Sequence, residues 1–190
     1  MVLLVLGLCL FLGVHSVSIV ANRWRDAMVA RMGENAWKGL YSLVSMVGLG
    51  LVVVGYAAAR RSPVFLWWPP FGLRHGVLAL MLPFFPLLFA AYMPGRISDA
   101  VKNPMLLAVG LWAAAHLLVN GALHDLALFG AFLVWAALDL LSLRWRVVRP
   151  VPGAPRGRWN DLICVVGGLG LYGATLFFLH EWLIGVAPLG

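Results

Sequence analysis

The stretch KGLYSLVSMVGLGLVVVGYAAA (Lys38–Ala59) decides the fold class. After its first lysine it contains no charged residue, and its apolar positions do not alternate with polar ones as they would in a half-buried strand. Only helices and closed barrels satisfy every backbone polar group in hydrocarbon. A helix needs about twenty apolar residues to cross a bilayer, so this stretch predicts a transmembrane helix.

The composition of the whole chain extends this prediction. Hydrophobic residues make up 63% of the 190 residues and charged residues 11%, whereas a soluble domain carries about a quarter charged residues. The composition therefore excludes a soluble protein. We predict an all-α, polytopic transmembrane helix bundle that forms one domain over residues 1–190, with the lipid bilayer as its first partner.

Apolar runs of similar length recur along the chain. We predict about six spans, at Val2–Val20, Lys38–Ala59, Leu73–Met93, Pro104–Asn120, Leu123–Leu143 and Asp161–Gly185. With the N-terminus outside, eleven of the 14 Lys and Arg residues fall in inner loops, and Arg60, Arg61 and Arg74 are outside. The positive-inside rule then places both termini on the non-cytoplasmic side. The net charge of +7 lies in these loops, so we expect no nucleic-acid partner.

Three loops have their own patterns. The segment Arg23–Lys38 is either a short amphipathic helix at the headgroup level or a solvated connector with a turn at Gly33. The outer segment Val64–Gly72 has tryptophans that suit the membrane interface and two adjacent prolines that exclude helix. The basic, proline-rich loop Arg149–Arg158 is expected to fix topology rather than to form a specific lipid site.

Few polar side chains remain in or beside the spans: His15, His116, Asp139 and His180 within them, and His75, Asn120, His124 and Asp125 near their outer edges. The sequence has no nucleophile–base arrangement, glycine-rich phosphate loop or zinc motif, so hydrolase chemistry has no support. Cys9 and Cys164 lie in different depth zones, and two cysteines make no metal framework.

His116 lies in LWAAAHLLVNG (Leu111–Gly121), a segment otherwise suited to lipid. An imidazole at that depth needs a partner. A haem iron shared with a second histidine would satisfy it, and so would a hydrogen bond to Asn120 or to a neighbouring helix. Gly110 and the three alanines before His116 either clear space for a flat ligand or serve close helix packing.

Asp139 and His15 share a depth zone. Each lies about four or five residues, roughly 6–8 Å, from the inner end of its span. The carboxylate would then either orient the His15 imidazole or pair with the basic loop at Arg144 or Arg146. His116 lies nearer the outer end, so its offset from His15 along the membrane normal is on the order of 10 Å.

The chain resembles the NnrU family of membrane proteins, whose more distant relatives include the 15-cis-ζ-carotene isomerases. The resemblance is carried by FLGVHSV (Phe11–Val17), LYSLVSMVGLGLVVVGY (Leu40–Tyr56), RHGVLALMLPF (Arg74–Phe84), AAYMPGRISDAVKNPMLLAVGLWAAAHLLVNG (Ala90–Gly121) and LFGAFLVWAALDLLSLRWR (Leu128–Arg146). These stretches occur in order and cover most of residues 1–146.

The resemblance implies haem b held by two axial histidines, which match His15 and His116. His75 is kept as the replacement ligand because it lies in the same outer zone as His116. It also implies a role in nitrogen-oxide metabolism, denitrification or redox physiology, in the inner (cytoplasmic) membrane of a bacterium. Ala113 stands where the isomerase relatives have a cysteine. Whether the chain is an enzyme stays open: the alternatives are a haem-dependent cis–trans isomerase of an apolar polyene such as a carotenoid, and a cofactor-free membrane interaction protein.

Overall fold

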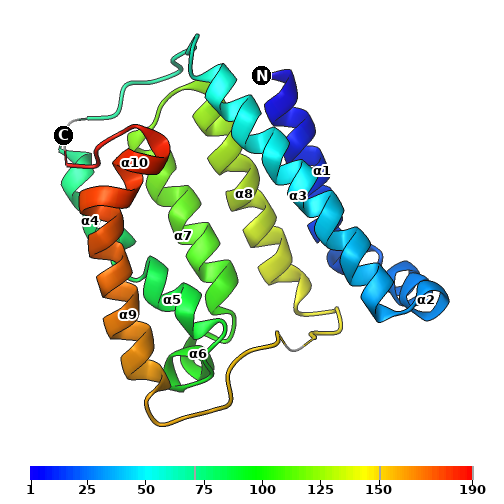
Figure 1. Ribbon diagram of the computed structural model, residues 1–190. Coiled ribbons are helices and arrows are strands. Elements are labelled where there is room, and N and C mark those ends of the chain that lie inside the picture. The colour runs from blue at the N-terminus through cyan, green and yellow to red at the C-terminus, as the bar shows by residue number, and fades with distance from the viewer. Residues whose placement is uncertain (71, 150, 190) are drawn as a thin grey trace. The chain divides into compact units, whose positions relative to one another are not determined.

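The computed structural model describes residues 1–70, 72–149 and 151–189. Phe71 of the outer aromatic segment, Pro150 of the basic loop and Gly190 lie outside the described residues. All regular elements of the described residues are helices (Figure 1), apart from an isolated bridge between Phe65 and Ala122. The prediction of an all-α helical protein is confirmed.

The helices belong to two compact units. Unit 1 comprises Met1–Phe71 and His116–Val148, and unit 2 comprises Gly72–Ala115 and Arg149–Gly190. Both units are therefore built from segments far apart in the sequence. The prediction that residues 1–190 form one domain stays a prediction.

Unit 1 contains three long apolar helices and a short one. They are α1 (Val2–Val20), α3 (Glu34–Ala59), α8 (Leu123–Ser142) and the connecting α2 (Asn22–Met32). Helices α1 and α3 run side by side (Figure 1) and form the most extensive helix pair among the described residues. Helix α1 also packs against α8.

Glycines let the backbones of α1 and α3 approach closely. A Cβ on Gly48 would lie 2.8 Å from the backbone nitrogen of Phe11, and one on Gly55 would collide with the backbone of Leu4. On the facing helix, a Cβ on Gly7 would lie 2.5 Å from the nitrogen of Val52. These pairs run in opposite sequence order, so the helices are antiparallel. Small residues at such contacts are the usual device of helix packing in membranes.

Unit 2 contains α4 (Leu73–Met81), α5 (Phe84–Ala90), α6 (Arg96–Val101), most of α7 (Pro104–Val119), α9 (Asn160–Ala174), the π-helical turn η1 (Thr175–Leu179) and α10 (His180–Ile184). Pro83 separates α4 from α5, because proline cannot supply the N–H that a continuous helix needs. Helix α9 packs on α5, where Gly168 meets Pro86. The Tyr172 hydroxyl donates to the carbonyl of Leu78 at 2.8 Å.

Five helical stretches of the described residues are long and apolar enough to cross a membrane: Val2–Val20, Glu34–Ala59, Leu73–Ala90, Leu123–Ser142 and Asn160–Ile184. The predicted fourth span is the shorter apolar helix α7, of 16 residues. The membrane character of the chain is thereby supported. The number of six spans and the orientation of the termini stay predictions.

The connecting segments agree with their sequence patterns. Helix α2 forms within Arg23–Lys38, which the helical alternative for this segment expected. It ends at Gly33, whose φ is +85°, and α3 begins at the next residue. The aromatic segment is non-helical at Pro69 and Pro70. It is tied to the start of α8 by backbone hydrogen bonds, including one of 2.8 Å from the Leu66 N–H to the carbonyl of Gly121.

Candidate functional site

His15 lies on α1 in unit 1 and is half-buried among aromatic rings. Its Nδ1 is 2.7 Å from the carbonyl oxygen of Phe11, one turn earlier. A carbonyl can only accept, so Nδ1 carries the proton and Nε2 of the neutral ring keeps its lone pair. Ring centroids of Phe11, Tyr41 and Trp135 lie 4.3, 5.3 and 6.0 Å from that of His15.

Two buried polar atoms accompany this aromatic cluster. Among the described residues, Ser45 Oγ and Trp135 Nε1 are buried with no hydrogen-bond partner. Trp135 contacts the His15 ring, and Ser45 follows Tyr41 by one turn of α3. A buried donor without a partner costs about 1–3 kcal/mol. Both donors are therefore positions where a bound polar group would be stabilised.

His116 lies on the part of α7 that belongs to unit 1. Its ring stacks on Phe129 of α8, with centroids 4.6 Å apart and planes at 27°. Asn120 donates from its side chain to the backbone carbonyl of His116 at 2.8 Å, and this bond does not involve the imidazole. Ala113 and Ala115 are fully buried, which agrees with a packing role for the small residues.

The two histidines contact the same helix at different levels. His15 meets Trp135 and His116 meets Phe129, and these two α8 residues are six positions apart, or about 9 Å along the helix. Phe11 and Phe132, with centroids 5.8 Å apart, join the two levels. This separation agrees with the offset expected from the sequence.

The other histidines of the spans are placed differently. His75 is exposed in the first turn of α4, in unit 2. His180 begins α10, and its Nδ1 lies 2.7 Å from the carbonyl oxygen of Val186. The described residues contain no group of three or more His, Cys, Asp or Glu side chains arranged to hold a metal ion. Cys9 and Cys164 are both free thiols.

Asp139 pairs with the basic segment that follows α8. Arg146 donates to its carboxylate at 2.5 Å, and the Ser142 hydroxyl bonds to the same carboxylate oxygen at 3.1 Å and to the Arg146 Nε at 2.7 Å. Since the Nδ1–H of His15 is bonded to the carbonyl of Phe11, the alternative in which Asp139 orients that imidazole is wrong. Pairing with Arg146 is confirmed.

The sequence did not reveal a second polar cluster of unit 1. The Tyr56 hydroxyl donates to Asp125 at 2.6 Å, and His124 Nε2 lies 3.5 Å from the same carboxylate oxygen. The other oxygen of Asp125 accepts the N–H of Ala122 at 3.2 Å, which caps α8. The sequence marked His124 and Asp125 only as polar residues near the outer edge of a span, and it did not indicate their contact with Tyr56. The cluster ties α3 to the start of α8.

A small cavity of about 230 Å³ lies near His15. It is lined by Val17, Ser18, Arg25, Trp37, Lys38, Tyr41 and Ser42. Tyr41 therefore faces both this cavity and the His15 ring. Two cations line the cavity, each in an ion pair with an acid close to it in the sequence: Arg25 with Asp26, and Lys38 with Glu34.

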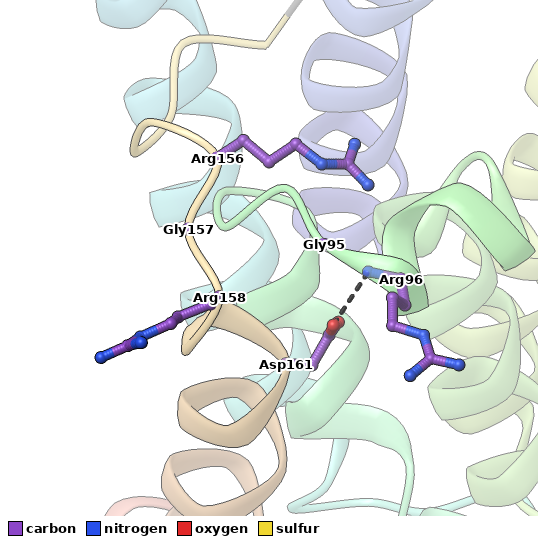
Figure 2. Close-up of a pocket in the computed structure, with 6 residues that line it drawn as sticks. All are labelled: Gly95, Arg96, Arg156, Gly157, Arg158 and Asp161. Carbon is purple, nitrogen blue, oxygen red and sulfur yellow. Dashed lines mark hydrogen bonds between the residues drawn. The ribbon is translucent and has the colours of Figure 1, made fainter.

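Unit 2 contains a basic pocket of about 370 Å³ (Figure 2). It is lined by Gly95, Arg96, Arg156, Gly157, Arg158 and Asp161. Arg156 forms two hydrogen bonds with Asp99 on α6, one of them 3.1 Å long. These bonds and the guanidinium charge hold the pKa of Asp99 below its usual range.

These features define a polytopic helical membrane protein with a half-buried histidine in an aromatic cluster and a basic pocket beside two of its candidate spans. The family model described as NnrU protein matches residues 3–188. The chain therefore belongs to the NnrU family. No curated protein and no solved structure matches it significantly. The more distant resemblance to carotene isomerases stays a prediction.

Proposed function

We propose that this NnrU-family membrane protein binds b-type haem, with His15 as one axial ligand and His116 as the other. The observation that carries the proposal is the bond between His15 Nδ1 and the carbonyl of Phe11. Metal-ligating histidines usually donate their second ring N–H to a carbonyl or a carboxylate, which fixes the tautomer and the ring orientation. In the structure, the bond to the Phe11 carbonyl already holds the His15 ring in such an orientation, with Nε2 left to bind a metal.

The surroundings of His15 suit a porphyrin. Aromatic rings provide apolar contact, and the unpartnered donors of Ser45 and Trp135 would gain an acceptor. Arg25 and Lys38 of the neighbouring cavity would hold the carboxylates of the porphyrin. Their present ion pairs are partly exposed and are worth little, so exchange of partners costs little. When bound, the haem supplies a one-electron redox centre.

The physiological setting that we propose is nitrogen-oxide metabolism or a related redox process, and it rests on family membership alone. The localisation that goes with it is the inner membrane of a bacterium. Deletion of the gene, followed by measurement of nitrite and nitric oxide turnover under denitrifying growth, tests this part. Unchanged turnover together with altered carotenoid isomers would move the assignment to the isomerase alternative.

An absorption spectrum of detergent-purified protein from haem-supplied cells tests the cofactor. We expect a Soret band that is lost or shifted in His15→Ala and in His116→Ala, and retained in His75→Ala. Loss in His116→Ala and His75→Ala, but not in His15→Ala, would transfer the axial role to His75. Circular dichroism confirms that each variant is folded. Absence of haem from a folded, haem-supplied preparation would refute the cofactor and leave a membrane interaction protein.

A further inference from the structure

We infer that the basic pocket of unit 2 binds the phosphate groups of anionic lipids. Its position in the chain sets its depth. The candidate span Leu73–Ala90 ends shortly before Gly95 and Arg96. The candidate span Asn160–Ile184 begins two residues after Arg158. Because α5 and α9 pack together, the pocket lies where one span leaves the hydrocarbon and the other enters it. That level is occupied by lipid headgroups.

The loop that forms the pocket is folded onto the segment after α5. The N–H of Ala154 donates to the carbonyl of Tyr92 at 2.8 Å. The buried Asn160 side chain donates to the carbonyls of Pro94 and Pro155 at 2.8 and 3.1 Å. A loop that only fixed topology would need its positive charges but not this set of bonds. These bonds fix the backbone of the loop, and the topological role expected from the sequence does not require that.

The acidic groups at the pocket are already engaged. Both carboxylate oxygens of Asp161 accept backbone N–H groups at 2.9 Å, one from Ile97 and the other from Arg96. Figure 2 shows the bond from Arg96. Asp99 is taken by Arg156. Beyond the Arg156–Asp99 pair, two arginines, Arg96 and Arg158, thus line the pocket with one carboxylate, and that carboxylate is bonded to the backbone. The balance of charge favours an anion, and guanidinium groups are suited to phosphate oxygens.

The directions of the side chains favour a lipid surface over a single enclosed phosphate. In Figure 2 the guanidinium groups of Arg96 and Arg158 extend in different directions from the pocket instead of converging. The Arg158 guanidinium lies 4.9 Å from the ring centroid of Trp159, and Trp159 is 57% exposed. Tryptophan and arginine are typical residues of the membrane interface. Several headgroups in one plane match this arrangement.

Lipid binding by the full-length protein in neutral detergent tests the inference. The probes are phosphatidylglycerol, phosphatidylcholine and inorganic phosphate, with bound lipid counted by native mass spectrometry. We expect wild-type protein to retain phosphatidylglycerol in preference to phosphatidylcholine. The double substitution R96Q/R158Q should weaken that retention by about thirtyfold, since each arginine near an anionic surface contributes about fivefold.

Matched variants distinguish lipid binding at this pocket from a general attraction of the positively charged protein for anionic lipid. R23Q/R31Q removes two exposed arginines from α2, outside the pocket, and should weaken retention less than R96Q/R158Q does. R96K/R158K keeps the charge and should retain most of the binding, which separates loss of charge from a general effect of substitution at these two positions. An equal loss in R23Q/R31Q, or no loss in R96Q/R158Q, would overturn the site. Displacement of the lipid by millimolar inorganic phosphate would overturn the lipid assignment and indicate a site for free phosphate.

Discussion

Substitution of Gly48 by alanine tests the helix packing and its link to the candidate site together. In α3, a Cβ at this position would lie 2.8, 3.0 and 3.1 Å from the N, Cα and Cβ atoms of Phe11 on α1. Relaxed contacts between heavy atoms lie at about 3.5–4.0 Å. Helix α1 must therefore move away by roughly 0.5–1 Å, because two of the three atoms belong to the backbone and cannot rotate aside.

The expected effect is a difference in free energy of unfolding between two glycine-to-alanine variants of α3. Overpacking costs about 1–3 kcal/mol, whereas replacing a helical glycine by alanine contributes about 0.5–1 kcal/mol of stability. Gly50→Ala is the matched control, because a Cβ on Gly50 meets nothing within 4 Å. Gly50→Ala should be neutral or stabilising, and Gly48→Ala should be less stable than this control by about 1–3 kcal/mol.

Unfolding in mixed micelles with increasing denaturing detergent, followed by tryptophan fluorescence, measures this difference. Equal stability of the two variants would refute the packing argument. The same pair tests the site, since the Phe11 carbonyl holds His15. If haem is bound as proposed, Gly48→Ala should shift the Soret band and Gly50→Ala should not. A clear loss of stability without a spectral change would separate the packing from the cofactor proposal.

Three further outcomes are expected. Tyr56→Phe removes a donor from the buried Asp125 and should lower the free energy of unfolding by about 1–3 kcal/mol. The same change at the exposed Tyr92 should have little effect, and equal effects would contradict a stabilising role for the Tyr56–Asp125 bond. Arg146→Gln leaves the Asp139 carboxylate without its cation and should destabilise by up to about 3–5 kcal/mol in the same assay, so an unchanged midpoint would argue against the ion pair. Reporter fusions at the C-terminus and in the proline-rich basic loop should report opposite compartments, and a common compartment would refute the predicted topology.

Much of the fold was predictable because a bilayer imposes one simple length scale on the sequence. The predicted first span coincides with α1 at both ends, Val2 and Val20. The third span was predicted from its length and hydropathy as Leu73–Met93, and the structure divides it at Pro83 into α4 and α5. Hydropathy does not register such a break, because proline is apolar and only its missing N–H interrupts the helix.

The sequence predicted the depth of the histidines of the candidate site in the membrane, but not which polar side chains bond to one another. Counting residues from the span ends gave the separation of His15 and His116 that their contacts on α8 show. The bond between Tyr56 and Asp125 joins residues 69 positions apart and depends on how α3 and α8 are rotated about their axes. Hydropathy carries little information on that rotation when nearly every face of a helix is apolar.

Some buried polar groups of unit 1 have hydrogen-bond partners within the chain, and others have none among the described residues. Asp139 and Asp125 are bonded within the chain, to Arg146 and Tyr56. The unpartnered donors of Ser45 and Trp135 have no such explanation among the described residues, and hydrocarbon offers them no water. Trp135 contacts the His15 ring, and Ser45 lies one turn of α3 after Tyr41, which also contacts that ring. The Nε2 lone pair of His15 is an acceptor whose position the bond at Nδ1 fixes. A ligand sought in this protein is therefore best sought beside His15, whichever second histidine completes the site.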